Sequence, residues 1–325
     1  MAYRSSSTIF PPPLKPGGTI GIVSPGRWLK PELIAKGKAL LEKRGYQTVV
    51  HAQNYLQDGQ LAGSDAARAE AIMDMFADRT IDAVMCARGG TGSIRLLERL
   101  DYKLIRRNPK PFIGFSDITV LLQAITRRCS FVTYHGPMTI IFAEKHDPRS
   151  VDDFFNVIGA KKSVRLRYPE AKAIRSGQAE GVLVGGNITL LQTLIGTPYD
   201  WASKDTILFI EDVDEILYRL DRTLYHLKLA GKFDGIRAVL VGEMCRMADG
   251  ETGFARKGER PYGKTLKEIL LDVLPPDIPL CFDVPCGHGG YVTTLPYGAE
   301  VKVSVSGRGV ELVFPSSPAG EVAKT

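Results

Sequence analysis

The chain has 325 residues, of which 44% are hydrophobic and 24% are charged, and this balance excludes a disordered chain and leaves room for two domains. Lys and Arg exceed Asp and Glu by 42 to 36, a formal net charge of +6. The basic residues do not gather into runs, and no aromatic residues are interleaved with them as in a nucleic-acid-binding module. We therefore expect no nucleic-acid partner.

The five cysteines predict reduced thiols rather than a disulfide framework, because their number is odd and the chain is not small. No C-x-x-C spacing occurs. Cys281, Cys286 and His288 are spaced so that they could ligate a metal, but free thiols are the simpler interpretation, so we expect no metal. The N-terminal segment has no apolar signal region, and no apolar run approaches the ~18 residues of a membrane span. We expect a cytoplasmic protein without membrane association.

Apolar runs alternate with amphipathic segments through the first part of the chain. The expected strands are residues 19–26, 46–51, 81–86 and 111–115. The expected helices are residues 31–44, 64–78, 93–100 and 118–127. Near-continuous apolar strands that alternate with helices are typical of a parallel sheet covered on both faces. Residues 1–150 are therefore predicted to form a doubly wound α/β domain.

The pattern changes after Pro148. Residues 151–180 are polar with short β-like stretches, and we interpret them as a linker or crossover. Residues 181–325 are predicted to form a second, more β-rich α/β domain. Its expected strands are 207–210, 238–241, 280–284, 300–305 and 309–314, and its helices are 189–194, 220–229 and 266–274. The polar loop 248–264 is long, and loops of that length are often functional.

Two segments of the first domain have the composition of an oxyanion site. Ser116 lies between a buried strand and a helix, as a serine does in a nucleophile elbow. The first amides of such a helix point to where an oxyanion forms. An N-cap role for Ser116 fits the spacing more readily. The run from Arg88 to Gly92 follows a strand, so it fits an anion-binding nest as well as a plain glycine-rich turn.

Histidine is the usual base for a serine nucleophile. His288 lies in a glycine-rich loop directly after the strand 280–284, and His135 follows an apolar strand, so both are candidates. A buried structural histidine is the alternative for either. The remaining three are expected to be surface or structural: His51, His146 and His226.

An acidic run begins where the strand 207–210 ends, at Glu211, and continues through Asp212, Asp214 and Glu215. A carboxylate at this position can orient a histidine and stabilise its imidazolium. It can also bind a metal or simply be solvated, and the pattern alone favours a solvated strand end.

Together and in order, these segments resemble the LD-carboxypeptidase family of serine peptidases, which includes the microcin C immunity peptidases. The resemblance spans almost the whole chain. The matching stretches are residues 21–25, 61–65 with Arg68, 87–93, 114–119, 135–138, 185–187 through 196–198, 208–211 with Tyr218, Arg219, Asp221 and Arg222, and 287–289.

The resemblance implies a Rossmann-like N-terminal domain, a smaller β-rich C-terminal domain, and a Ser-His-Glu triad at their junction. Ser116 would be the nucleophile, His288 the base and Glu211 the orienting acid, with Glu215 as the alternative acid. The amides of Asp117 and of the Gly89–Gly90 turn would form the oxyanion hole. No metal or organic cofactor is implied, and a homodimer is expected. The implied reaction releases the terminal D-alanine from murein tetrapeptides in cell-wall recycling.

Substrate recognition is less specified by these motifs. Arg88 or a helix N-terminus is expected to bind the free carboxylate of the substrate. The chain has Thr91 where relatives often have an aromatic residue, and the segment after His288 also departs from the family pattern. Asp212 favours the murein-recycling branch. The alternatives are an immunity-type peptidase that cleaves an aminoacyl nucleotide, for which loop 248–264 offers only Phe254 and Tyr262 as aromatic clamps, and a non-catalytic two-domain binding protein.

Overall fold

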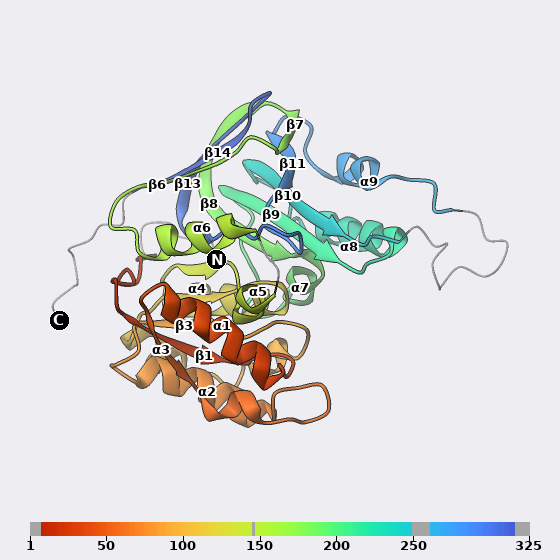
Figure 1. Cartoon of the computed structure of the whole chain (residues 1–325). Helices are drawn as coiled ribbons and strands as arrows, with labels where there is room; N and C mark the ends of the chain where they lie inside the picture. The colour runs from red at the N-terminus through yellow and green to blue at the C-terminus, as the bar shows by residue number, and fades with distance from the viewer. Residues whose placement is uncertain (1–7, 145–146, 249–260, 316–325) are drawn as a thin grey trace.

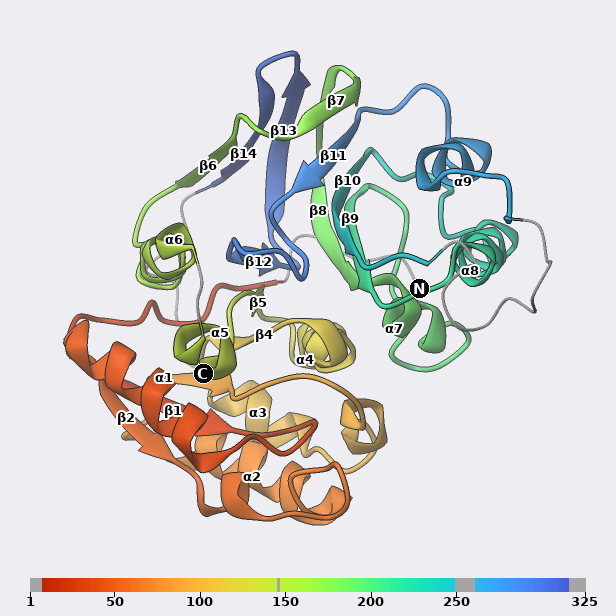
Figure 2. The ribbon, with the colours of Figure 1, turned by 45° about the vertical axis from the view of Figure 1, so that its right-hand side comes forward.

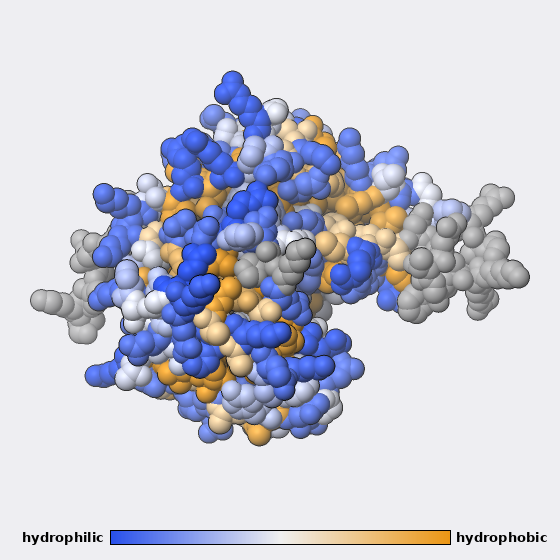
Figure 3. Space-filling view, in the orientation of Figure 1, coloured by the Kyte–Doolittle hydropathy of each residue, from blue (hydrophilic) through white to orange (hydrophobic). Residues whose placement is uncertain are grey.

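The computed structural model describes residues 8–144, 147–248 and 261–315, and within these ranges no helix has the length and apolar character needed to cross a bilayer. Two mixed α/β domains lie against each other (Figures 1 and 2). On the face seen in Figure 3, hydrophilic side chains are spread over both domains, in keeping with a modest net charge that is not clustered in sequence.

The first sheet has six strands in the order β12-β5-β4-β3-β1-β2. Five of them are parallel: β1 (Thr19–Val23), β2 (Gln47–Val50), β3 (Ala83–Cys86), β4 (Phe112–Gly114) and β5 (Thr133–His135). The sixth, β12 (Leu295–Tyr297), comes from near the end of the chain and pairs antiparallel with β5. The helices are α1 (Pro31–Lys43), α2 (Asp65–Ala77), α3 (Tyr102–Arg107), α4 (Thr119–Cys129) and α5 (Thr139–Ala143). The parallel-sheet prediction for the N-terminal domain is confirmed.

The helix expected at residues 93–100 is only partly present. A short 3-10 turn covers Ser93–Leu96, and the helix α3 begins later. Its N-cap is Asp101, whose side chain accepts hydrogen bonds from the amides of Lys103 and Leu104. Asp101 is a cap signal in the sequence that the prediction did not use.

The second sheet has eight strands in the order β6-β14-β13-β8-β9-β10-β11-β7. Its parallel centre is β8 (Gly177–Asn187), β9 (Thr206–Val213), β10 (Ala238–Cys245) and β11 (Leu280–Val284). The antiparallel strands are β6 (Val164–Tyr168), β7 (Lys172–Arg175), β13 (Glu300–Ser306) and β14 (Gly309–Phe314). The helices are α6 (Pro148–Ile158), α7 (Ile188–Thr193), α8 (Leu217–Leu229) and α9 (Leu266–Val273).

Residues 151–180, which we interpreted as a linker or crossover, contain most of α6, strands β6 and β7 and the start of β8. β6 and β7 are the two outermost strands of the second sheet, so each pairs on one side only. Edge strands commonly carry exposed charges. On β6, Arg165 and Arg167 are exposed and both pair with Glu311 of β14. These charges gave the segment its polar composition.

Candidate active site

Ser116 stands on a sharp turn between β4 and α4. Phe115 is fully extended, with φ −151° and ψ −175°, and Ser116 then has φ 62°, in the left-handed region that residues other than glycine rarely adopt. A Cβ on Gly114 would lie 2.7 Å from Cγ2 of Ile118, so only glycine allows the chain to fold back here. This is the strand–turn–helix geometry of a nucleophile elbow. Ile118, not Ser116, is the N-cap of α4.

Ser116, His288 and Glu211 form one line of hydrogen bonds. Nε2 of His288 lies 3.1 Å from Oγ of Ser116, and Nδ1 of the same ring lies 2.7 Å from Oε2 of Glu211. Glu211 is fully buried in β9, whereas the His288 side chain keeps 20% of its surface exposed. The three residues are far apart in sequence and come from both sheets, so the line exists only because the carboxyl ends of β4, β9 and β11 meet.

The electrostatics of the pair favour a charge on the imidazole. Burial acts to lower the pKa of His288, but the hydrogen bond and the charge of Glu211, aided by Asp212, outweigh burial and raise it. Burial also raises the pKa of the Glu211 carboxyl, against the opposing effect of His288. This buried acid is therefore placed to stabilise the positive charge that the imidazole acquires when it takes a proton.

The glycine-rich turn lies directly against the serine. A Cβ on Gly89 would lie 3.2 Å from Cβ of Ser116 and 3.3 Å from the amide nitrogen of Asp117. Gly90 has φ 111°, which favours glycine. The Asp117 side chain is buried, where it accepts a hydrogen bond from the Ser93 amide at 3.1 Å, and burial raises its pKa. The backbone of Gly89 and the Asp117 amide thus lie next to Ser116, so they are candidates for the donors of an oxyanion hole.

We expect Gly89→Ala to lower kcat by about 10²- to 10³-fold, because displacement of the turn would cost about as much as losing an oxyanion donor. The added methyl group would fill the space between Ser116 and the Asp117 amide. The matched control is Gly307→Ala, because nothing lies within 4 Å of a Cβ there. Steady-state kinetics of both variants would check this, and an unchanged kcat in Gly89→Ala would place the oxyanion elsewhere.

Arg88 does not belong to the line of hydrogen bonds from Ser116 to Glu211. Its Nη1 donates to the carbonyl oxygen of Trp28 at 3.4 Å, and its buried Nε has no hydrogen-bond partner within the described residues. Burial, followed by the nearby charge of Arg27, lowers its pKa. The two guanidinium groups form a cationic region next to the glycine turn. Arg27 was not among the candidates identified from the sequence.

Two other acids of the strand end, Asp212 and Glu215, have hydrogen-bond partners other than His288. Oε1 of Glu215 accepts from the amide of Ile216 at 2.8 Å. Asp212 is buried and accepts hydrogen bonds from Asn187 and Thr189 at the start of α7. Of the acidic run, Glu211 is the member whose carboxylate reaches His288.

The remaining histidines within the described residues have structural partners. His135 is fully buried on β5 and bonds through Nε2 to the carbonyl oxygen of Cys286 at 2.7 Å, so it does not reach Ser116. His51 accepts a hydrogen bond from the Gln53 amide, His226 bonds to Gln192, and His146 lies outside the described residues. In the described ranges, no three His, Cys, Asp or Glu side chains converge as a metal site would require.

Glu243 is a site residue that the sequence analysis missed. It lies near the end of β10, and its Oε2 accepts a hydrogen bond from the amide of Gly287 at 2.8 Å. The signal that selected Glu211, an acid following an apolar strand, was also present here.

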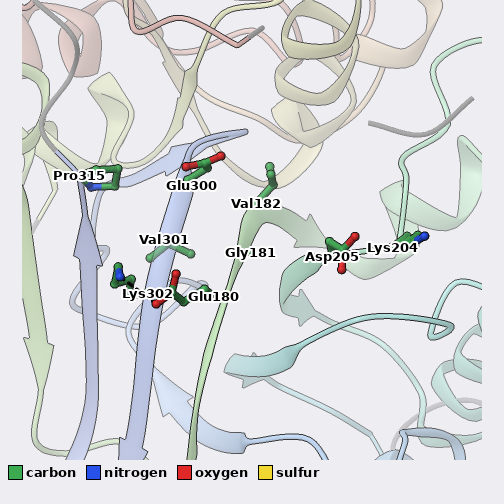
Figure 4. A pocket seen from close by; sticks show the side chains of 9 residues that line it. All are labelled: Glu180, Gly181, Val182, Lys204, Asp205, Glu300, Val301, Lys302 and Pro315. Carbon is green, nitrogen blue, oxygen red and sulfur yellow. Dashed lines mark ion pairs between the residues drawn. The ribbon is translucent and has the colours of Figure 1, made fainter. Parts of the chain in front are cut away.

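The cavity of about 360 Å³ drawn in Figure 4 is separate from these groups. Residues of β8 and β13 and the two residues before β9 line much of it, and none of the three triad candidates contributes. Its charged residues Glu180 and Lys302 pair with each other and are exposed, which is typical of a solvent-filled groove.

Comparisons with known proteins identify the family of the chain. The LD-carboxypeptidase N-terminal domain model matches residues 20–136, and the C-terminal domain model matches residues 180–303. A probable murein peptide carboxypeptidase of Bacillus subtilis is 32% identical, over 91% of this chain and 92% of its own length. The microcin C7 self-immunity protein MccF of Escherichia coli is 27% identical, over 94% and 96%.

The crystal structure of a muramoyltetrapeptide carboxypeptidase from Oxalobacter formigenes superposes with a TM-score of 0.79 at 26% identity, covering 92% of this chain and 99% of that one. The family models, the relatives and the fold agree over both domains. The chain belongs to the LD-carboxypeptidase family.

Proposed function

We propose that the protein is a serine carboxypeptidase that hydrolyses the L,D-peptide bond of murein tetrapeptides and releases the terminal D-alanine, a step of cell-wall recycling. The observation that carries the proposal is the line of hydrogen bonds from Ser116 through His288 to the buried Glu211. The names of relatives that act on murein peptides support the substrate class.

In the proposed reaction, Nε2 of His288 takes the hydroxyl proton of Ser116 while Oγ attacks the scissile carbonyl carbon. The oxyanion is held by the amides of Asp117 and of the Gly89–Gly90 turn. The C–N bond then breaks as His288 gives its proton to the departing amine of D-alanine. Water, deprotonated by His288, hydrolyses the acyl-enzyme, and the proton returns to Ser116. No step requires a metal or an organic cofactor.

The free carboxylate of the substrate needs a cationic partner near the oxyanion site. Arg88 remains our proposed partner, because it is half-buried next to Gly89 and its Nε is unpaired within the described residues. A planar guanidinium can bind a carboxylate through two parallel hydrogen bonds.

We also propose a homodimer in the cytoplasm. All five cysteines are free, as suits a reducing compartment.

The proposed dimer surface is one face of α8, which exposes the large side chains of Tyr218, Tyr225 and Leu229. Such apolar stripes often mark contact surfaces. We expect light scattering to give twice the mass of one chain, and Leu229→Glu to shift it toward the monomer. A wild-type monomer at micromolar concentration would contradict the proposal.

The test of function is D-alanine release from a purified murein tetrapeptide by the wild-type protein. Aspartyl sulfamoyl adenosine is the alternative substrate, because the MccF structure with that compound is 25% identical and superposes with a TM-score of 0.83. Of the aromatic residues considered for an adenine clamp, Phe254 lies outside the described residues, and Tyr262 donates to Asp221. Cleavage of the nucleotide conjugate without D-alanine release would favour the immunity-type function, and binding without cleavage of either would favour a ligand-binding protein.

A further inference from the structure

Side chains hold both the C=O and the N–H group of the peptide unit that joins Cys286 to Gly287. The carbonyl oxygen of Cys286 accepts from Nε2 of His135 at 2.7 Å, and the Gly287 amide donates to Oε2 of Glu243 at 2.8 Å. His135 lies on β5 in the first sheet and Glu243 on β10 in the second. The peptide unit just before His288 is therefore fixed from both domains.

His135 is suited to this contact because it is a neutral donor. A backbone carbonyl can only accept, so Nε2 must carry the proton. Burial lowers the pKa of His135 to about 4, although the hydrogen bond to Cys286 acts in the opposite direction. At neutral pH the ring is therefore uncharged, and it adds no positive charge beside the imidazolium that forms at His288.

The His135 ring also contacts the chain next to the other two triad residues. It packs edge-on against Phe115, with ring centroids 5.8 Å apart, and against Phe209 at 4.9 Å. Phe115 directly precedes Ser116, and Phe209 lies two residues before Glu211 on the same face of β9. One buried ring therefore lies against the neighbours of Ser116 and Glu211 while it bonds to the loop of His288.

Glu243 explains the glycines on either side of His288. A Cβ on Gly287 would lie 2.6 Å from the backbone oxygen of Glu243, and a Cβ on Gly289 would lie 2.5 Å from Oε1. The close approach of the Glu243 backbone thus requires glycine at position 287, and a Cβ at position 289 would displace the Glu243 carboxylate.

The far end of the same loop is held independently by α6 and the residue before it. The Asp147 amide donates to the carbonyl oxygen of Gly290, and the Val292 amide donates to Oγ of Ser150 at 2.9 Å each. With residues 290–292 anchored in this way, the orientation of the peptide unit at 286–287 decides where the intervening His288 points.

We propose that His135 and Glu243 are positioning residues that hold the 286–287 peptide unit, and through it the His288 imidazole, in line between Ser116 and Glu211. The inference rests on the proposed function in taking these three side chains as the reacting groups. Rotation of that peptide unit would move the imidazole, and a misplacement of about 1 Å can cost about 100-fold in rate.

The test compares variants that remove a hydrogen-bonding group with variants that keep it. His135→Leu and Glu243→Leu remove the donor and the acceptor, whereas His135→Gln and Glu243→Gln retain them. The readout is the rate at which a fluorophosphonate labels Ser116, which requires no peptide substrate. We expect labelling to slow about 100-fold in the leucine variants and to recover most of the wild-type rate in the glutamine variants. The exposed controls His226→Leu and Glu180→Gln should label at the wild-type rate.

Two further measurements separate positioning from general loss of structure. Because both side chains act on one peptide unit, the double variant His135→Leu/Glu243→Leu should label about as slowly as the slower single variant. The proton between His288 Nδ1 and Glu211 should give a far-downfield NMR signal in the wild type that is lost in the leucine variants, while circular dichroism stays unchanged. If the leucine variants do not fold, Glu243→Asp, whose shorter side chain withdraws from the Gly287 amide, replaces them.

A folded leucine variant with the wild-type labelling rate and an unchanged downfield signal would overturn the inference. Failure of the proposed function is distinguishable from this result. If the wild type is labelled but releases no D-alanine, the substrate proposal fails and the labelling rates still decide on His135 and Glu243. If the wild type is not labelled, the NMR signal decides: its loss in the leucine variants supports positioning, and its persistence contradicts it.

Discussion

Replacing Ser116 or His288 with alanine should lower kcat for D-alanine release by about 10⁶-fold, the loss typical of removing a serine nucleophile or its base. Ser116→Ala removes the attacking oxygen. His288→Ala removes the group that receives its proton, which lies 3.1 Å from Oγ in the intact site. The measurement is D-alanine released from the tetrapeptide under steady-state conditions, with His226→Ala, which alters an exposed histidine, as control.

The double variant Ser116→Ala/His288→Ala should be no slower than either single variant, because the two groups act as one unit. KM should change little, since neither side chain is proposed to bind the substrate before the reaction. A folded Ser116→Ala variant that keeps more than about a hundredth of the wild-type kcat would remove Ser116 from the role of nucleophile. The arrangement of the Gly89–Gly90 turn and Glu211 would then have to serve a different reaction.

Glu211→Gln should lower kcat by about 10⁴-fold, the effect of replacing the acid of a serine triad with its amide. In the intact site, Oε2 of Glu211 accepts from Nδ1 of His288, which leaves Nε2 free to take the serine proton. A glutamine amide can donate to Nδ1 instead, and this favours the tautomer in which Nε2 already carries a proton. The matched control is Glu180→Gln, an exposed carboxylate on β8.

The pH profile gives the same prediction a second readout. Glu211 raises the pKa of His288 against the effect of burial, so removing the carboxylate should let that pKa fall. The reaction needs His288 neutral, and activity is lost as pH falls through its pKa. The acid limb of kcat/KM should therefore lie above pH ~6.5 in the wild type and move to lower pH in Glu211→Gln. An acid limb that stays in place would show that another group sets it.

The secondary structure near the site was the part of the fold most open to prediction. β1, β3 and β4 are near-continuous apolar runs, and α1 and α2 carry amphipathic spacing, so their order predicted a parallel sheet. The two outermost strands of the second sheet, β6 and β7, escaped prediction because half-exposed edge strands alternate charged and apolar residues and resemble a linker. Pairing partners far along the chain, such as β12 with β5, leave no local signal in the sequence.

The candidate site was also predictable only in its local features and not in its long-range contacts. Ser116, Glu211 and His288 each follow a predicted strand, which made them candidates. The local pattern favoured an N-cap role for Ser116 and a solvated strand end for Glu211, and it left a structural role open for His288. Their alignment depends on two sheets meeting, which periodicity cannot reveal. The pairing of His135 with Cys286 spans 151 residues, and that of Glu243 with Gly287 spans 44, so neither was visible locally. The glycines beside His288 were noticed, but the neighbour that requires them was not.

The pairing of β12 with β5 also bears on how the chain folds. A fragment that ends before Leu295 would leave β5 as an unpaired edge, open to aggregation or to pairing with another chain. During synthesis, the N-terminal domain therefore emerges early but cannot complete its sheet until Tyr297 has left the ribosome. His288 has been synthesised by then, so the sheet that carries Ser116 is completed only when its histidine partner is also present.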